Sequence, residues 1–427
     1  MPDSVRPCRN YVELHIILLY FPAFCDTILI LINFTAENSR WNINIFAKVF
    51  PAKSPQIHPT ISEFAEEEQF RSETMAYLRE SNGVESYSVP SPFPPLYKYR
   101  ALSTYAVEDI MNHRFAATSI GSFNDVFDGA MHAYGDEKQR TALAQKKWEE
   151  IEELGRRCGL PGLLPHDSFV KNMEAHYKQE SRSKFRMDDY LGTYVFCLSE
   201  RNDSILMWAH YANENTGICI EYDFNELDGA SLVRKCLFPV LYCSKPIDVL
   251  PLFDKDNPSK LTYPIDTAAL CTALSKADVW EYEKEWRFVE IDTQAKAQRL
   301  FRQATIPKRI IFGNRLLKPL FYYQSDDNSK RKKCEEAYDL IMRLLDYMVS
   351  EGIRASIAIP KVGFFELEMN NLDASKLKQF LTVEFGWRNK SENMRYYDVI
   401  EDKLYNFIDK EKETELSKAG DKNEHDV

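Results

Sequence analysis

The segment EYEKEWR at positions 281–287 combines three acids, two bases and two aromatic residues. From Glu283 onward the alternation has the period of two that is typical of a β-strand, which places Glu285 and Trp286 on opposite sides. A carboxylate beside bulky aromatic groups indicates a desolvated pocket, where it stabilises positive charge that develops during a reaction. Alternating charges along a strand are also typical of a solvated face, so both interpretations of Glu285 stay open.

A second group of aromatic and polar side chains lies between two expected strands. The apolar run 194–198 and the segment 218–222 are both rich in residues that favour strands. Between them, Ser204 is suited to cap a short helix over 205–212. Mixed folds commonly place a site on side chains that follow the end of a strand. The helix carries Trp208, His210 and Tyr211.

These three side chains also have structural interpretations. Trp208 and Tyr211 are large residues that commonly belong to a hydrophobic core. His210 has the unperturbed pKa of a general base at neutral pH, although a lone histidine at a helix end is more often structural.

An earlier part of the sequence offers groups that bind a phosphate or an aromatic ring. The aromatic alternation of LYKYR at 96–100 predicts a strand that ends in Tyr99 and Arg100. A helix over 105–113 and a strand over 114–120 are expected to follow. The next loop is rich in turn-forming residues and contains three candidates, Phe123, Asn124 and Asp125.

Composition limits the classes of function. The 427 residues are enough for two or three domains. The formal charge of −11 argues against general nucleic-acid binding, because phosphate contacts need a basic surface, although a local basic groove is compatible with it. The nine cysteines include no CxxC pair, which predicts reduced thiols in a cytoplasmic protein rather than a zinc ribbon or a disulfide framework.

Residues 1–90 form an N-terminal extension that differs from the rest of the chain. The apolar stretch 11–34 is long enough to span a bilayer. Five residues unsuited to a membrane span interrupt it: Glu13, His15, Pro22, Asp26 and Asn33. Polar groups are expensive at that depth, so a membrane anchor is disfavoured. Two alternatives explain this stretch. It is a strand-rich addition, or it is an upstream extension before a working protein that begins near Met75.

The expected domain organisation follows from changes in composition. The Pro/Ser-rich segment 86–95 predicts a linker. An α+β core domain is expected over 91–370, with a helical insertion at 130–190. A helical extension over 371–412 and a disordered tail over 413–427 complete the chain.

Two further predictions concern the core domain. Residues 235–242 favour a strand that Pro239 kinks, and residues 267–277 favour a helix.

Four motifs occur in order along the core: LYKYR at 96–100, SFNDVFD at 122–128, LSERNDSILMWAHYA at 198–212 and EYEKEWR at 281–287. Together they resemble the bacterial domain-of-unknown-function family twenty-nine seventy-one, whose pattern is KYR, FNDPFD, LMWxHYA with a following Gly, and EKEWR. The resemblance covers about 96–368 and implies no settled activity. The sequence departs from the family pattern at Val126, where proline is usual, and at Glu214-Asn215, where a histidine often precedes the glycine.

The order of elements is also similar to the ADP-ribosyltransferase fold. That fold has a strand with Arg or His, a helix, a strand, then a strand followed by a Ser/Tyr-bearing helix, and a strand with a catalytic Glu. The corresponding residues here are Arg100, Ser199, Tyr211 and Glu285. The resemblance implies a split mixed β-sheet of the ADP-ribosyltransferase-like type, although a fold layout does not fix function.

This layout implies an enzyme that consumes NAD, by transfer to a protein or nucleic-acid acceptor or by hydrolysis. Cleavage of the nicotinamide–ribose bond passes through an oxocarbenium-like state, as glycoside cleavage does. Glu285 is the carboxylate expected to stabilise that state, with Tyr211 and His210 as further catalytic candidates. Arg100 is expected to hold a phosphate of NAD. The other expected NAD-binding residues are Tyr99, Phe123, Asn124, Asp125, Ser199 and Trp208.

Two other functions stay open. The same fold is compatible with a non-catalytic module for nucleotide sensing or protein interaction. A metal-dependent hydrolase or nuclease would use Asp125, Asp128, His210 and Glu285, since hard oxygen ligands suit Mg²⁺, but no HxxxH pair supports it and no metal ligand is assigned. Arg100 also has a structural alternative, an ion pair with Glu285 or Asp128.

Overall fold

A computed structural model gives the fold of two units, which we describe separately. Unit 1 comprises Met1–Thr60, Met131–Phe185 and Asp248–Ala268, and unit 2 comprises Ile61–Ala130, Arg186–Ile247 and Ala269–Val427. The structure describes residues 13–21, 26–37, 40–51, 88–125, 127–132, 137–157, 162, 165–180, 185–186, 192–248, 265–292, 298–324, 328–385 and 397–423.

Three strands form an antiparallel sheet in the N-terminal part of unit 1. They are β1 (Glu13–Phe21), β2 (Asp26–Glu37) and β3 (Arg40–Pro51), in the order β1-β2-β3. The apolar stretch 11–34 is thus divided between two strands. None of the described helices combines the length and apolar character needed to cross a bilayer. Met75, the alternative start, lies outside the described residues.

Two helices form where the sequence predicts the helical insertion. α4 (Glu137–Arg157) and α5 (His166–Glu180) pack on each other. Their contact is a small core of Ala144, Val170 and Tyr177, with Leu143, Trp148 and Met173 against it. The outer faces are charged, which is typical of amphipathic helices that bury one stripe only.

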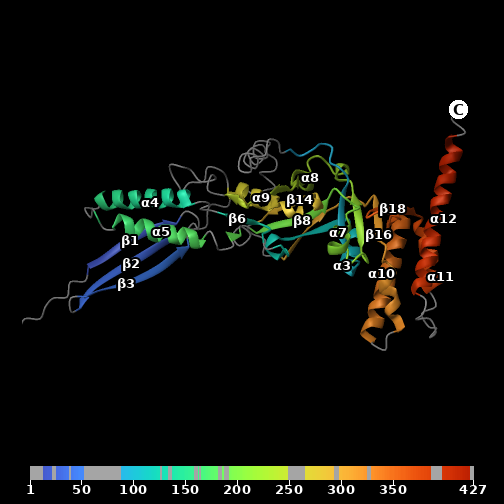
Figure 1. The fold of residues 1–427 in the computed structure, drawn as a ribbon, viewed down its shortest axis with the longest axis horizontal. Coiled ribbons are helices and arrows are strands. Elements are labelled where there is room, and N and C mark those ends of the chain that lie inside the picture. Colours follow the sequence, from blue (N-terminus) through green and yellow to red (C-terminus); the bar gives the residue numbers. More distant parts are fainter. Residues whose placement is uncertain are drawn as a thin grey trace, which may run out of the picture. The chain divides into compact units, whose positions relative to one another are not determined.

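Unit 2 contains one ten-stranded mixed sheet. Its strand order is β10-β14-β8-β4-β9-β16-β17-β18, and β5 joins β8 and carries β15. Only β16 and β17 are parallel, while the other pairs are antiparallel. β8 and β14 lie side by side in Figure 1. The strands are β4 (Leu96–Arg100), β5 (Arg114–Ser119), β8 (Thr193–Ser199), β9 (Ile218–Tyr222), β10 (Leu237–Pro239), β14 (Glu285–Ile291), β15 (Arg299–Gln303), β16 (Arg309–Gly313), β17 (Arg354–Pro360) and β18 (Leu367–Leu372). The predicted α+β class with a mixed sheet is therefore confirmed.

The sheet divides between β4 and β8. A single residue pair, Tyr97 with Ser199, joins these two strands. Beyond that pair, β5 takes over the same edge of β8 by pairing Thr118 with Val195. In the gap, the Nζ atom of Lys98 donates a hydrogen bond to the carbonyl oxygen of Cys197 at 2.7 Å. A side chain thus replaces a backbone partner where the two halves of the sheet separate.

Helices and shorter elements complete the chain. α10 packs against α3, α11 and the 3₁₀ helix η6. The helices are α3 (Thr104–Met111), α7 (Ile205–Tyr211), α8 (Leu232–Lys235), α9 (Ile265–Leu274), α10 (Asn328–Glu351), α11 (Ala374–Phe385) and α12 (Tyr397–Asn423). The 3₁₀ helices are η2 (Ile120–Ser122), η3 (Phe224–Glu226), η5 (Asp278–Glu283) and η6 (Lys318–Gln324). The short strands are β6 (Ala130–His132), β7 (Phe185–Arg186), β11 (Leu241–Cys243), β12 (Ile247–Asp248) and β13 (Ser275–Ala277). They form two small sheets, a β11-β13 pair and a β12-β6-β7 triplet.

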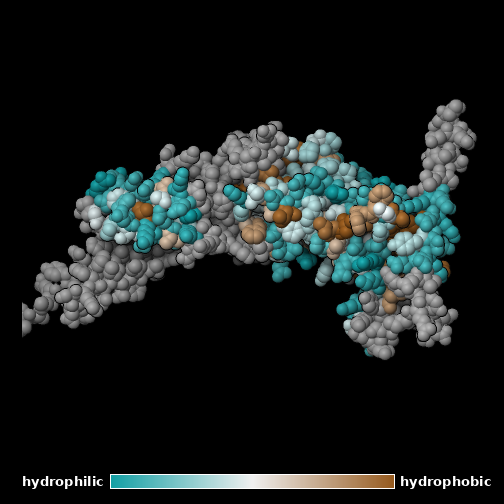
Figure 2. All heavy atoms as spheres, viewed as in Figure 1, coloured by the Kyte–Doolittle hydropathy of each residue, from teal (hydrophilic) through white to brown (hydrophobic). Residues whose placement is uncertain are grey.

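Some apolar side chains also reach the surface, where Figure 2 shows brown patches among hydrophilic residues. The most exposed are Val362 and Phe365, which are 95% and 100% exposed in the turn between β17 and β18.

α7 begins where the sequence predicts and ends in an unusual turn. Ser204 caps it, because its side chain accepts a hydrogen bond from the backbone N–H of Met207. Three successive residues after the helix have left-handed backbone, with φ of 47° at Asn213, 55° at Glu214 and 67° at Asn215. After this turn, the carbonyl oxygens of Arg100 and Ala212 lie so close to Gly217 that no side chain fits there.

Four parts of the fold differ from the sequence prediction. Pro239 ends a strand over 235–242 rather than kinking it, so β10 and β11 are separate, since proline has no N–H for a sheet ladder. The helix predicted over 267–277 ends at Leu274, and its last three residues form β13, which pairs with β11.

The linker and the tail are the other two differences. The last part of the segment 86–95 is anchored on the core, because the backbone of Phe93 exchanges two hydrogen bonds with the Asn225 side chain, both 2.9 Å long. α12 continues through Asn423 where disorder is predicted from 413, since Glu, Lys, Ala and Leu favour a helix there.

We expect Gly217→Ala to destabilise unit 2 by about 2 kcal/mol or more, the cost of forcing atoms into a packed site. The added methyl would lie 2.3 Å from the carbonyl oxygen of Arg100 and 2.8 Å from that of Ala212. Urea unfolding followed by tryptophan fluorescence measures the effect. Gly229→Ala is the matched control, because nothing lies within 4 Å of the methyl it adds. Equal stability of the two variants would contradict the close approach.

Candidate functional site

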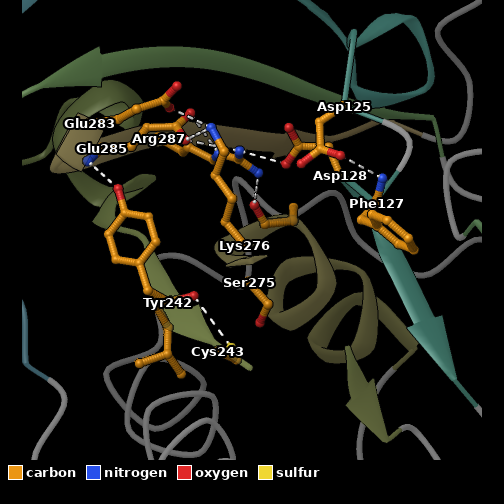
Figure 3. Close-up of polar contacts among 12 residues, drawn as sticks. Asp125, Phe127, Asp128, Tyr242, Cys243, Ser275, Lys276, Glu283, Glu285 and Arg287 are labelled. Atoms are coloured by element: carbon orange, nitrogen blue, oxygen red, sulfur yellow. Dashed lines mark hydrogen bonds and ion pairs between the residues drawn. The ribbon is translucent and has the colours of Figure 1, made fainter. Parts of the chain in front are cut away.

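Five charged side chains form a buried cluster in unit 2, drawn in Figure 3. Arg287 is 0% exposed, and the other four are no more than 7% exposed. Asp128 precedes β6, Lys276 lies on β13, Glu283 ends η5, and Glu285 and Arg287 lie on β14. Buried charges persist only when they are paired, so the contacts among these five residues decide what the cluster does.

Arg287 is the centre of the cluster. Its Nε atom lies 2.9 Å from Oε1 of Glu285, and its Nη2 atom lies 3.0 Å from Oε2 of the same carboxylate. Nη2 also lies 2.7 Å from Oδ1 of Asp128, and Nη1 donates to the carbonyl oxygen of Ala273 at 2.6 Å. All three guanidinium nitrogens therefore have partners, in the bidentate geometry that favours arginine over lysine.

Lys276 joins the two glutamates. Its Nζ atom lies 2.8 Å from Oε2 of Glu285 and 2.5 Å from Oε2 of Glu283. The ammonium also lies 5.3 Å from the centre of the Trp280 ring. The other oxygen of Glu283 accepts a hydrogen bond from the Tyr211 hydroxyl at 2.8 Å. The chain of contacts thus runs from Asp128 inside to Tyr211, which is half-buried.

The backbone around Glu283 and Glu285 is held from three sides. Lys284, between them, has left-handed backbone with φ of 44°, which ends η5 before β14 begins. Ser199 Oγ donates to the carbonyl oxygen of Glu283 at 2.5 Å. The N–H of Glu285 donates to the Tyr242 hydroxyl at 2.7 Å. These contacts fix both carboxylates toward Lys276.

The charges of the cluster do not balance, since three carboxylates face two cations. Burial opposes ionisation of Glu285, but the positive charges of Arg287 and Lys276 outweigh it and lower the pKa of Glu285 to about 2. Burial raises the pKa of Glu283 and that of Asp128, although each has a cationic partner. Glu283 therefore combines a pKa shift in the direction expected of a general acid or base with a hydrogen bond to the half-buried Tyr211.

Half-buried aromatic rings surround the cluster. The guanidinium of Arg287 lies 5.6 Å from the centre of the Phe123 ring. Tyr282 packs with Tyr211 on the core cluster of α7, and its ring lies 6.0 Å from that of Trp280. Half-exposed rings beside buried charge are suited to hold a planar ligand.

Four of the predicted site residues lie at this cluster: Phe123, Ser199, Tyr211 and Glu285. The solvated-face interpretation of Glu285 is wrong, because the side chain is only 4% exposed. Asp125 lies nearby in the loop, where its Oδ1 accepts from the N–H of Phe127 at 2.9 Å (Figure 3).

Arg100 does not lie with them. Residues paired across strands share a face, and Glu285 pairs with Ser199, which pairs with Tyr97. Arg100 is three positions beyond Tyr97 and therefore lies on the opposite face. Its Nη1 atom pairs with Asp109 Oδ2 at 3.0 Å, not with Glu285 or Asp128.

The other predicted residues are core or surface residues. Trp208 is fully buried, and its ring packs edge-on against Tyr99 with centres 5.3 Å apart, so neither ring is available to stack on a ligand. Their polar atoms bond to backbone carbonyls of Asn202 and Arg201. His210 and Asn124 are exposed.

Sequence reasoning missed the partners of Glu285. Arg287 and Asp128 stand in the recognised motifs, so their charges were visible but their pairing was not. Lys276 was missed because its segment favours a helix. Glu283 was assigned to the strand pattern, whereas it ends η5.

The residues proposed as alternative metal ligands do not assemble. Asp128 and Glu285 both bind Arg287, and His210 is exposed. Within the part of the chain that the structure describes, no group of three or more His, Cys, Asp or Glu side chains could hold a metal ion.

Fold and site define an α+β protein whose divided mixed sheet carries a buried charged cluster on β14. Residues 207–288 match the family described as "Protein of unknown function (DUF2971)". The predicted family resemblance is thus confirmed. The match includes four of the five cluster residues: Lys276, Glu283, Glu285 and Arg287. No curated protein and no solved structure matches the chain.

We expect Glu285→Gln to destabilise unit 2 most at neutral pH. The pKa of Glu285 falls from an ordinary 4.5 to about 2. This shift corresponds to about 3 kcal/mol of stability that is present above pH 4.5 and lost as pH falls toward 2. Urea unfolding of both proteins at pH 7 and pH 3 measures the difference, which should shrink at the lower pH.

Glu281→Gln is the control for this comparison, because it breaks an exposed ion pair with Lys284 and should change stability by less than about 1 kcal/mol. A Glu285→Gln effect of the same size at both pH values would show that the carboxylate is not held ionised by its neighbours.

Proposed function

We propose that this protein cleaves the nicotinamide–ribose bond of NAD, as an ADP-ribosyltransferase-like enzyme or an NAD glycohydrolase, with Glu283 as the reacting carboxylate. The observation that carries the proposal is the contact of Glu283 with the Tyr211 hydroxyl at the half-buried end of a cluster with one excess acid. The division of the sheet at a single residue pair supports a split-sheet fold of this type.

The excess negative charge suits a ligand that is, or becomes, positively charged. The nicotinamide ring of NAD is cationic, and the half-buried rings of Tyr211, Trp280 and Tyr282 suit it through cation–π contact and stacking. The cluster itself is closed by its own ion pairs, so we assign the ring to the aromatic rim above Glu283.

A carboxylate stabilises the transition state of this reaction more than it stabilises the ground state. The C–N bond breaks and its electron pair stays on nicotinamide, which leaves as a neutral molecule while positive charge appears on the ribose. Glu283 stabilises that charge and then takes the proton of the attacking water or acceptor group. Tyr211 orients the carboxylate through its hydrogen bond.

Glu285 has a positioning role in this scheme rather than the reacting role expected from the sequence. Its two oxygens bind two cations, Arg287 and Lys276, whereas those of Glu283 bind one cation, Lys276, and a neutral hydroxyl, that of Tyr211. Through Lys276 it holds Glu283 in place. Arg100 contributes nothing to this site, since it lies on the other face of the sheet, and we assign no residue to the phosphates of NAD.

A non-catalytic module for nucleotide or protein binding is the second candidate. The internal pairing of the cluster favours it, because satisfied buried charges also stabilise a fold without taking part in chemistry.

Incubation of the full chain with NAD, with and without cell lysate, tests the proposal through release of nicotinamide and labelling of acceptors. We expect Glu283→Gln to lower the rate about 10²–10⁴-fold, the usual contribution of a general base. Tyr211→Phe should lower it less, because it removes one orienting hydrogen bond. Glu281→Gln is the control, since Glu281 is an exposed acid two positions away.

Binding of NAD without any nicotinamide release would support the non-catalytic module instead. Full activity of a folded Glu283→Gln variant would exclude Glu283 as the reacting group.

A further inference from the structure

Arginine and aromatic side chains alternate in a row on the surface formed by β15, β5 and α3. The guanidinium of Arg299 lies 5.6 Å from the centre of the Tyr105 ring, and that of Arg114 lies 4.4 Å from the centre of the Phe301 ring. Arg299 and Phe301 are two positions apart on β15 and so lie on one side of that strand. The order is Tyr105, Arg299, Phe301, Arg114, and we call these four residues the arginine–aromatic row.

The rings of this row are open to solvent. Tyr105 is 66% exposed and Phe301 is 46% exposed, and the side chain of Arg114 is 37% exposed. Large exposed aromatic residues that cluster on a surface indicate a binding site rather than a core. Each ring has one face toward a guanidinium, an arrangement that leaves stacking area for a further planar group.

The row is also locally basic in an acidic protein. Arg114 shares the Asp109 carboxylate with Arg100, at 3.1 Å and 3.0 Å, so one acid serves two arginines. Arg299 pairs with no carboxylate among the residues that the structure describes. The neighbouring Arg302 is neutralised by Glu290, which confines the excess positive charge to the row.

We propose that the arginine–aromatic row binds single-stranded nucleic acid, with bases stacked on Tyr105 and Phe301 and phosphates held by Arg114 and Arg299. Rings that accept any base and cations that follow the backbone are the two components of such sites. A duplex hides the faces of its bases, so it would use the arginines of the row but not the rings. An acidic peptide would also bind the arginines only, because it offers no planar group for the rings to stack on.

This inference does not depend on the proposed NAD chemistry, because none of the four residues contacts the charged cluster. It also agrees with the net charge of −11, which disfavours general binding but permits one basic strip. The two phosphate-binding arginines should make the affinity fall as the salt concentration rises.

Fluorescence anisotropy of the full chain with a labelled 15-nucleotide single strand at low and moderate salt tests the inference. We expect Tyr105→Ala to weaken binding roughly ten- to a hundred-fold, the usual effect of losing one stacked base. Arg299→Gln should weaken it and lower the slope of log affinity against log salt by about 1. Lys332→Gln is the matched control, because it removes an exposed charge on α10 that lies outside the row.

Three results would overturn the inference. They are no binding at low salt, equal affinity of the Tyr105→Ala, Arg299→Gln and Lys332→Gln variants, and equal affinity for a strand of the same length whose bases have been removed. Tyr105 and Arg299 are both on the surface, so we expect their variants to fold. Circular dichroism spectra that match the parent protein would show that a loss of affinity comes from the row and not from unfolding.

Discussion

The buried guanidinium of Arg287 is the interaction on which this part of the fold depends. It binds a carboxylate in its own strand, a second from a distant loop, and the carbonyl oxygen of Ala273 in α9. An unpaired arginine at 0% exposure would be prohibitively costly, so the loop with Asp128, the end of α9 and β14 must assemble together. One side chain thus links three segments that are far apart in the sequence.

The second consequence of this pairing is chemical. Arg287 and Lys276 satisfy Glu285 and keep it ionised, whereas burial raises the pKa of Glu283. The same desolvation therefore produces two different glutamates two positions apart. Proteins assign separate roles to chemically identical acids by placing them in environments that shift their pKa values apart.

The local structure was largely predictable from the sequence, and the tertiary pairing was not. The strands Leu96–Arg100 and Ile218–Tyr222 have the predicted bounds, because hydrophobic period and composition decide them locally. Ser204 capped the predicted helix for the same reason. Lys276 could not be placed, since nothing local shows that its strand pairs with β11.

The sequence predicted only part of the candidate site. Acids and aromatic residues in motifs pointed to Glu285, Tyr211 and Phe123, but burial decides whether such residues are core, cluster or surface, and burial is set by distant segments. Trp208 and Arg100 show this: both stand in the motifs, yet one is enclosed by Tyr99 and the other pairs with Asp109. Register across β4, β8 and β14 separates Arg100 from Glu285, and register is a property of pairs of strands.

The junction of β4 and β8 has a mechanical meaning. A ladder of one residue pair with a lysine ammonium beside it resists shear far less than the seven pairs that join β8 to β14. The two halves of the sheet are thus coupled loosely here, because a displacement of β4 relative to β8 breaks the pairing of only one residue pair. The sheet therefore places a weakly paired junction, between β4 and β8, next to a cluster that several ion pairs hold together.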